Sequence, residues 1–190
     1  IFKILGIKYS SILSGQLLKI IGPIFRSNNI CNSNLSIAFP KLNNLQKKAI
    51  IKSMWFNYGR MFAEYLYISQ FRNSELSKNI HIENQDELEI IKKSSKPVIF
   101  VSGHFNNFEL MAMHIEKSGI NLAAIYRPLN NIFLNPLMEK IRTKYICKKQ
   151  IKKGISGTKK LVKYFKEGNS IALMIDQRVS EGLKIDLFNK

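Results

Sequence analysis

From residue 97 onward, short apolar runs alternate with longer segments of helical character, and this alternation constrains the fold more than any other feature of the sequence. The runs are rich in aliphatic residues, as expected of strands that are buried on both faces. Strands that alternate with helices predict an α/β fold, with a mostly parallel central sheet flanked by helices. The expected strands are 97–102, 121–126, 145–151, 170–176 and 183–188, and the expected helices between them are 107–117, 135–144 and 157–166.

The first half of the chain has a different, helical pattern. We therefore predict a helical N-terminal region, 1–95, and an α/β core, 96–190, which together form one domain. The clearest helix is 45–68, in which apolar and aromatic side chains recur every three or four residues. Two interpretations of this stripe are open. It packs against the protein core, as the apolar face of a helix commonly does, or it lies at a membrane interface, because basic side chains occupy its other faces.

The chain is strongly basic, with a formal net charge of +17. Such an excess favours polyanionic partners, namely nucleic acid, anionic lipid headgroups or acidic carrier proteins. The basic residues are spread between apolar positions and form no long block. No RRM, KH or helix-turn-helix signature accompanies them, so a non-enzymatic nucleic-acid-binding module is kept as an alternative of a different class.

Cysteines, apolar stretches and chain ends give further expectations. Cys31 and Cys147 form no ligand cluster with the histidines, so we expect two unpaired thiols and no metal site. The most apolar stretch, 11–25, falls short of the ~20 apolar residues of a spanning helix, so we expect none within this chain. The sequence begins without methionine and stops just after an expected strand. We therefore expect a partial sequence, truncated at its C-terminal end and preceded by an apolar helix.

The segment 102–109, SGHFNNFE, is the strongest candidate for chemistry. His104 follows an expected strand, and Glu109 falls in the first turn of the next helix. On one continuous helix their side chains would point about 140° apart, so they can meet only if His104 lies in the loop before the helix. Gly103 permits a sharp exit from the strand, and an asparagine at 106 or 107 is a suitable helix cap.

These residue types suit proton transfer. A neutral histidine can accept the proton of a hydroxyl group, and a carboxylate on its other ring nitrogen fixes the tautomer and stabilises the imidazolium. We therefore predict His104 as a general base and Glu109 as its orienting partner. No Gly-x-Ser-x-Gly elbow is present, so a hydrolase is not supported. Ligands of parallel sheets bind beyond the carboxyl ends of the strands, which also directs attention to Arg127 and Asp176.

The stretch SGHFNNFE resembles the H-x-x-x-x-D/E signature of the lysophospholipid acyltransferase superfamily. More narrowly, the chain resembles the lipid A biosynthesis lauroyl/myristoyl acyltransferases in four other segments, which follow the family's order over nearly the whole chain. It departs from the family where Asn106 replaces a common glycine, where Phe108 replaces a common tryptophan, and at 185–189, where a Pro-Phe-Phe-Gly-like run is usual. The four segments are NLSIAFPKLNNL at 34–45, MWFNYGRMFAE at 54–64, YRPLNN at 126–131 and IDQRVSEG at 175–182.

The resemblance implies a lysophospholipid acyltransferase-like fold and a specific reaction. A fatty acyl chain would pass from a thioester, on acyl carrier protein or coenzyme A, to a hydroxyl of a lipid A precursor in lipopolysaccharide biosynthesis. No cofactor beyond that co-substrate is implied. Arg127 and Arg142 would hold lipid phosphate or carboxylate, and Asp176 would position the basic residues.

The implied partners are a membrane lipid, an anionic membrane surface and an acidic acyl carrier protein, with no nucleic acid. The implied location is the cytoplasmic face of the bacterial inner membrane. A glycerophospholipid or glycolipid acceptor is the alternative within the same superfamily.

Overall fold

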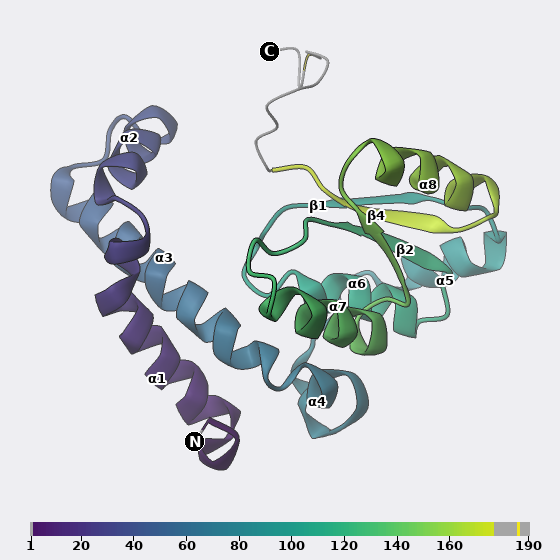
Figure 1. Ribbon diagram of the computed structural model, residues 1–190, viewed down its shortest axis with the longest axis horizontal. Coiled ribbons are helices and arrows are strands. Elements are labelled where there is room, and N and C mark those ends of the chain that lie inside the picture. Colours follow the sequence, from purple (N-terminus) through teal and green to yellow (C-terminus); the bar gives the residue numbers. More distant parts are fainter. Residues whose placement is uncertain (1, 177–185, 187–190) are drawn as a thin grey trace.

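The computed structural model describes residues 2–176 and Asp186, and it divides into a helical arm and an α/β core (Figure 1). The helices of the arm and of its connection to the core are α1 (Phe2–Phe25), α2 (Asn28–Ala38), α3 (Asn44–Tyr65), α4 (Ile68–Asn73), the 3-10 helix η1 (Glu75–Asn79) and α5 (Gln85–Ser94). The arm consists of α1, α2 and α3, which lie to one side of the sheet (Figure 1). The short helix α4 joins the arm to the core.

Within residues 2–176, the core is built around a parallel sheet of four strands. Its elements are β1 (Ile99–Ser102), α6 (Glu109–Lys117), β2 (Leu122–Tyr126), α7 (Leu134–Tyr145), β3 (Lys149–Lys152), α8 (Ile155–Lys166) and β4 (Ser170–Met174). The strand order is β1-β4-β2-β3, so the last described strand lies inside the sheet, between β1 and β2. Helix α8 covers one face of the sheet, and α6 and α7 lie on the other (Figure 1).

The predicted fold class is confirmed, because the structure is mixed α/β with a parallel sheet and a helical N-terminal region. The strands and helices expected up to residue 176 are present, with their ends shifted. The largest shift is in the strand expected at 145–151, which begins at Lys149 because α7 continues to Tyr145. The strand expected at 183–188 lies largely outside the described residues.

The helix expected at 45–68 forms as two helices. Asn43 starts α3 with a capping box, in which its side chain accepts a hydrogen bond from the Gln46 amide and the Gln46 side chain accepts one from the Asn43 amide, both at 2.9 Å. The helix ends at Tyr65, and α4 begins at Ile68. The chain therefore turns toward the core at the end of the aromatic stripe.

The stripe on α3 has a buried part and an exposed part. Trp55 and Ala63 are buried on the face toward α1, where a Cβ added at Gly22 would lie 2.2 Å from the Trp55 ring. Such close approach is possible because small residues lie in the seam between the helices. Tyr58 and Phe62, which border this face of α3, are 46 % and 58 % exposed. The core interpretation is thus confirmed for the buried part, and the membrane interpretation stays open for the exposed part.

Helix α1 differs from the sequence-based expectation. We expected no segment long and apolar enough to span a membrane, but α1 extends back to Phe2 and has 24 residues with a mean hydropathy of 1.2. That expectation is wrong, because it took the apolar stretch to begin at residue 11 and so left out the first nine residues of the helix. Only 17 % of the apolar window is buried within the protein. Gly6, at φ 70, interrupts the helical backbone near the start.

The main apolar core joins α4 to α6 and the central strands, with Met113, Ile146 and Leu122 among its buried members. Both cysteines are described, and each is a buried free thiol, as expected. Burial raises the pKa of the Cys147 thiol to about 11. The thiol is therefore protonated near neutral pH and acts as a packing group.

Candidate active site

Two polar residues meet at the carboxyl end of the sheet because their strands are neighbours. Strands β1 and β4 run in parallel, and Ser102 is the register partner of Met174. His104 lies two residues beyond Ser102, and Asp176 lies two residues beyond Met174, so both leave the sheet at the same level. Residues that are 72 positions apart in the chain are thereby placed side by side.

Asp176 holds His104 through two hydrogen bonds. The His104 backbone amide donates to Asp176 Oδ2 at 2.7 Å, and Nδ1 of the ring lies 2.6 Å from Oδ1. The hydrogen bond from the His104 backbone amide lowers the pKa of Asp176, and the hydrogen bond from the His104 ring lowers it further. The carboxylate is therefore ionised at neutral pH. An ionised carboxylate at Nδ1 keeps a proton on that nitrogen and leaves Nε2 as the proton acceptor. The His104 side chain is 29 % exposed and can reach a bound substrate.

The loop between β1 and α6 is compact. A Cβ at Gly103 would lie 2.9 Å from the Phe105 ring and 3.1 Å from Asp176 Oδ2, so a side chain there would disturb the carboxylate. Asn106 has a left-handed backbone with φ 47, a conformation that asparagine tolerates better than most residues. The helix begins at Glu109, so the asparagines at 106 and 107 precede the cap residue. The Phe108 ring contacts the His104 ring edge-on, with centroids 4.5 Å apart.

Glu109 belongs to a second polar cluster. Arg142 binds its Oε1 through Nε at 2.8 Å and through a terminal nitrogen at 2.6 Å, and the Tyr65 hydroxyl donates to the same oxygen. Glu109 is only 6 % exposed, so a cation and a phenol together replace its hydration. Burial alone would lower the pKa of Arg142, but the negative charge of Glu109 and the hydrogen bond to it outweigh burial and raise it.

The structure therefore gives His104 and Glu109 different hydrogen-bond partners. The carboxylate bonded to the His104 ring is Asp176, and the cation bonded to Glu109 is Arg142. The predicted pairing of His104 with Glu109 stays a prediction, as does the phosphate-binding role of Arg142. Asp176 lies where the sequence placed it, at a strand end, but its contact is with the histidine.

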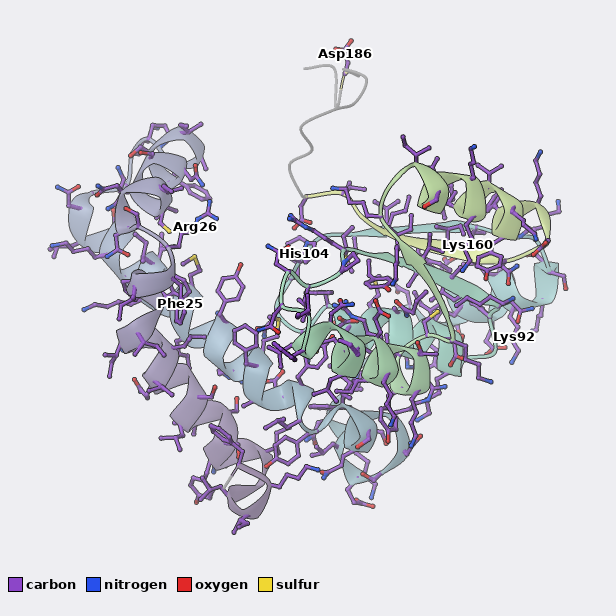
Figure 2. The ribbon with its side chains drawn as sticks, in the orientation of Figure 1. Phe25, Arg26, Lys92, His104, Lys160 and Asp186 are labelled. Carbon is purple, nitrogen blue, oxygen red and sulfur yellow. The ribbon has the colours of Figure 1, made fainter. Side chains whose placement is uncertain are left out.

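A large cleft, of about 1110 Å³, opens between the arm and the core and contains both polar groups. Glu109 lines it from the core. His104, also from the core, and Arg26, which follows the end of α1, line it too, and both are labelled in Figure 2. Helix α3 supplies further lining from the arm, through Met54, Asn57, Tyr58 and Met61. A space of this size accommodates an extended ligand, and His104 lies at its wall.

A comparison with models of protein families identifies the family of the protein that carries this cleft. The model for the bacterial lipid A biosynthesis acyltransferases matches residues 1–190, the whole chain. The chain belongs to this family. Among curated proteins, none matches it.

As a family member, the chain is an acyltransferase of lipid A biosynthesis, from a family that is bacterial and membrane-associated. Its cleft has an apolar part suited to such chemistry. Ala124 of β2 and Ala172 of β4 are register partners, and both line the cleft together with Ala112 of α6. Three small side chains there leave room that larger ones would fill.

Sequence reasoning missed two residues of this acyltransferase site. Tyr65 was assigned only to the aromatic stripe, although its hydroxyl reaches Glu109. Lys153 lines the cleft one residue after β3, level with Arg127, because Tyr126 and Lys152 are register partners. The rule that ligands bind beyond strand ends could have identified Lys153 from the sequence, as it identified Arg127. Lys152 itself pairs with Glu139 at 3.2 Å.

Proposed function

We propose that this protein is a late acyltransferase of lipid A biosynthesis, which transfers a fatty acyl chain from an acyl thioester to a hydroxyl group of a lipid A precursor. The donor would be acyl carrier protein or coenzyme A. The observation that carries the proposal is the His104–Asp176 pair at the wall of a large, partly apolar cleft, in a chain of this family.

The reaction needs one general base. Nε2 of His104 takes the proton of the acceptor hydroxyl as its oxygen attacks the thioester carbonyl carbon. Asp176 keeps Nδ1 protonated and stabilises the imidazolium that forms. When the tetrahedral intermediate collapses, the carbon–sulfur bond breaks and the imidazolium returns the proton to the leaving thiolate. The products are an ester and a free thiol, and no acyl-enzyme intermediate is required.

Glu109 and Arg142 form the fixed polar wall of the cleft in this proposal. Their side chains are 8 % and 13 % exposed, so the pair is largely removed from solvent. Removing one partner of such a pair leaves an uncompensated buried charge, which is strongly destabilising. We therefore assign Glu109 first to the placement of the loop that carries His104, and the Glu109→Gln variant described below tests whether it also orients the ring.

Arg127 and Lys153 are the proposed contacts for an anionic group of the substrate. Both are exposed, both line the cleft, and they project from the ends of neighbouring strands. Arg142 is less suited to this role, because its guanidinium is bonded to Glu109 and lies 5.5 Å from the centre of the Tyr126 ring. A guanidinium beside an ammonium suits the phosphate of a lipid headgroup or of the carrier's prosthetic arm.

The remaining assignments concern location and carrier. The exposed apolar surface of α1 and the net charge of +17 support attachment to an anionic membrane. We place the protein on the cytoplasmic face of the inner membrane, where acyl thioesters and lipid A precursors would meet. The same positive charge suits an acidic acyl carrier protein as donor.

The test is acyl transfer by the full-length protein in anionic vesicles, with an acyl thioester and a lipid A precursor, followed by mass spectrometry of the lipid. We expect one added acyl chain, and a loss of about 10²–10⁴-fold in rate for His104→Ala. His81→Ala is the matched control, because His81 is exposed in a loop. Full activity of His104→Ala would contradict the assignment of the base. Acylation of a glycerophospholipid in place of the lipid A precursor would contradict the proposed acceptor.

A further inference from the structure

The last two residues of α3 both contact the loop that carries His104. The side-chain amide of Asn107 donates to Glu64 Oε2 at 3.1 Å, and the hydroxyl of Tyr65 donates to Glu109 Oε1. These contacts join positions 43 and 44 residues apart in the chain. The loop is thus held from two sides, by β4 through Asp176 and by the arm through the end of α3.

The loop needs support of this kind. Asn106 is in the left-handed region, which costs free energy for a residue with a side chain, and such a conformation persists only when its surroundings fix it. It lies between His104, which Asp176 binds, and Asn107, which Glu64 binds. Loss of either contact releases one side of the loop and lets the backbone around the histidine relax.

Tyr65 is suited to hold a carboxylate. Burial and the negative charge of Glu109 raise the pKa of the Tyr65 phenol, so it stays protonated and remains a donor at any physiological pH. Its partner Glu109 is the first residue of α6, so its position fixes where the loop ends and the helix begins. A hydrogen bond to a buried charged group contributes more to stability than one between neutral groups.

We propose that Tyr65 and Glu64 are positioning residues, through which the arm sets the geometry of the catalytic loop. The proposal rests on the proposed function in taking His104 as the base. Helix α3 packs along α1, the helix with the exposed apolar surface, and it also lines the cleft. The arm that would meet the membrane therefore also carries, at the end of α3, the two side chains that hold the loop. Neither side chain needs to touch the reacting atoms.

The first experiment measures kinetics of the full-length protein in vesicles. Tyr65→Phe removes the hydroxyl and keeps the ring, and we expect kcat to fall about 10- to 100-fold with KM changed less than about threefold. Tyr9→Phe, at an exposed tyrosine of α1, is the matched control. Wild-type kcat in Tyr65→Phe, or a change in KM alone, would overturn the proposal.

Glu64 offers a conservative rescue. Glu64→Ala removes the acceptor for Asn107, whereas Glu64→Gln keeps an oxygen there, so we expect kcat to fall in the first variant and to stay within about threefold of the wild type in the second. Equal loss in both variants would mean that the negative charge of Glu64, and not its bond to Asn107, matters. That result would overturn the positioning role.

A second measurement does not depend on activity. Hydrogen–deuterium exchange of the wild type, Tyr65→Phe and Glu64→Ala should show faster exchange at residues 103–110 in both variants, with the sheet unchanged. Unchanged exchange in this segment would overturn the proposal even if all the proteins are active. If the wild type transfers no acyl group while the variants loosen this segment, the proposed function fails and the structural role of Tyr65 and Glu64 stands.

Discussion

Gly59 of α3 lies against the backbone of Ser14 in α1, so closely that a Cβ at position 59 would lie 2.2 Å from the Ser14 carbonyl oxygen. The two helices of the arm can approach this far only because position 59 has no side chain. The backbone oxygen cannot rotate away as a flexible side chain could, and any larger residue must push the helices apart.

We therefore expect Gly59→Ala to destabilise the arm by about 1–3 kcal/mol, the usual cost of overpacking. Alanine favours a helix more than glycine does, so a loss of stability would report on the seam and not on helix propensity. Ser53→Ala, at an exposed position of the same helix, is the control. Thermal unfolding in detergent measures the effect, and an unchanged or higher Tm for Gly59→Ala would contradict the close packing.

The two carboxylates near His104 should respond differently to neutral substitution. Asp176→Asn removes the charge that stabilises the imidazolium, so we expect kcat to fall about 10²–10⁴-fold. The carboxylate is 44 % exposed, so we expect a loss of thermal stability that is measurable but smaller than that of Glu109→Gln. Glu109→Gln leaves Arg142 as a buried cation with a neutral partner, so we expect a clear loss of stability as well as of activity. Rates and Tm measured on the same preparations separate the two. A stable, inactive Glu109→Gln beside an active Asp176→Asn would instead support Glu109 as the orienting partner.

The His104–Asp176 contact should also appear in the acid dependence of stability. The bonds from His104 lower the pKa of Asp176 below its usual value of 3.8, so the contact contributes stability that is present above that value and is lost as pH falls through the lower, folded-state value. The Tm difference between the wild type and Asp176→Asn should therefore be constant near neutral pH and should shrink below about pH 4. A difference that stays constant down to pH 3 would show that the Asp176 charge makes no such contribution.

The alanines of the cleft should limit acyl chain length. Ala124→Leu adds three carbon atoms where Ala124 and Ala172 line the cleft, so we expect the preference to move toward shorter acyl chains, by about tenfold in the ratio of rates. Competition between acyl thioesters of increasing length, read by mass spectrometry of the product, measures this ratio. Ala38→Leu, at an exposed position at the end of α2, should leave the ratio unchanged. An unchanged ratio in Ala124→Leu would place the acyl chain elsewhere in the cleft.

Much of the fold followed from local pattern. The strands and helices of the core were visible because buried parallel strands form short aliphatic runs and the helices between them end at glycines such as Gly119 and Gly168. The residues at which the helices and strands end were harder to predict from the sequence, because tertiary packing determines them. Helix α7, for example, continues to Tyr145 and is followed by the buried Ile146 and Cys147.

The site followed from the sequence only in part, because its residues come from distant segments. His104 could be found from the segment 102–109 and from the resemblance that segment carries. Its bond to Asp176 could not be found, because it depends on β4 lying beside β1, and the sequence does not state the order of strands in a sheet. The same holds for Lys153 beside Arg127, which depends on β3 lying beside β2. Local spacing favoured Glu109 as the partner of His104, but local spacing could not reveal that Arg142, 33 residues away, binds the same carboxylate.

The place of β4 in the sheet has a consequence for the order in which the protein is made. During synthesis β1, β2 and β3 leave the ribosome first, but β1 has no neighbour among them, since its partner among the described strands is β4. The interior of the sheet is completed only when residues 170–174 emerge, and the same few residues carry Asp176 to the histidine. A nascent chain that stops short of this point therefore has an imidazole without its carboxylate, and proton transfer becomes available in the same event that closes the sheet.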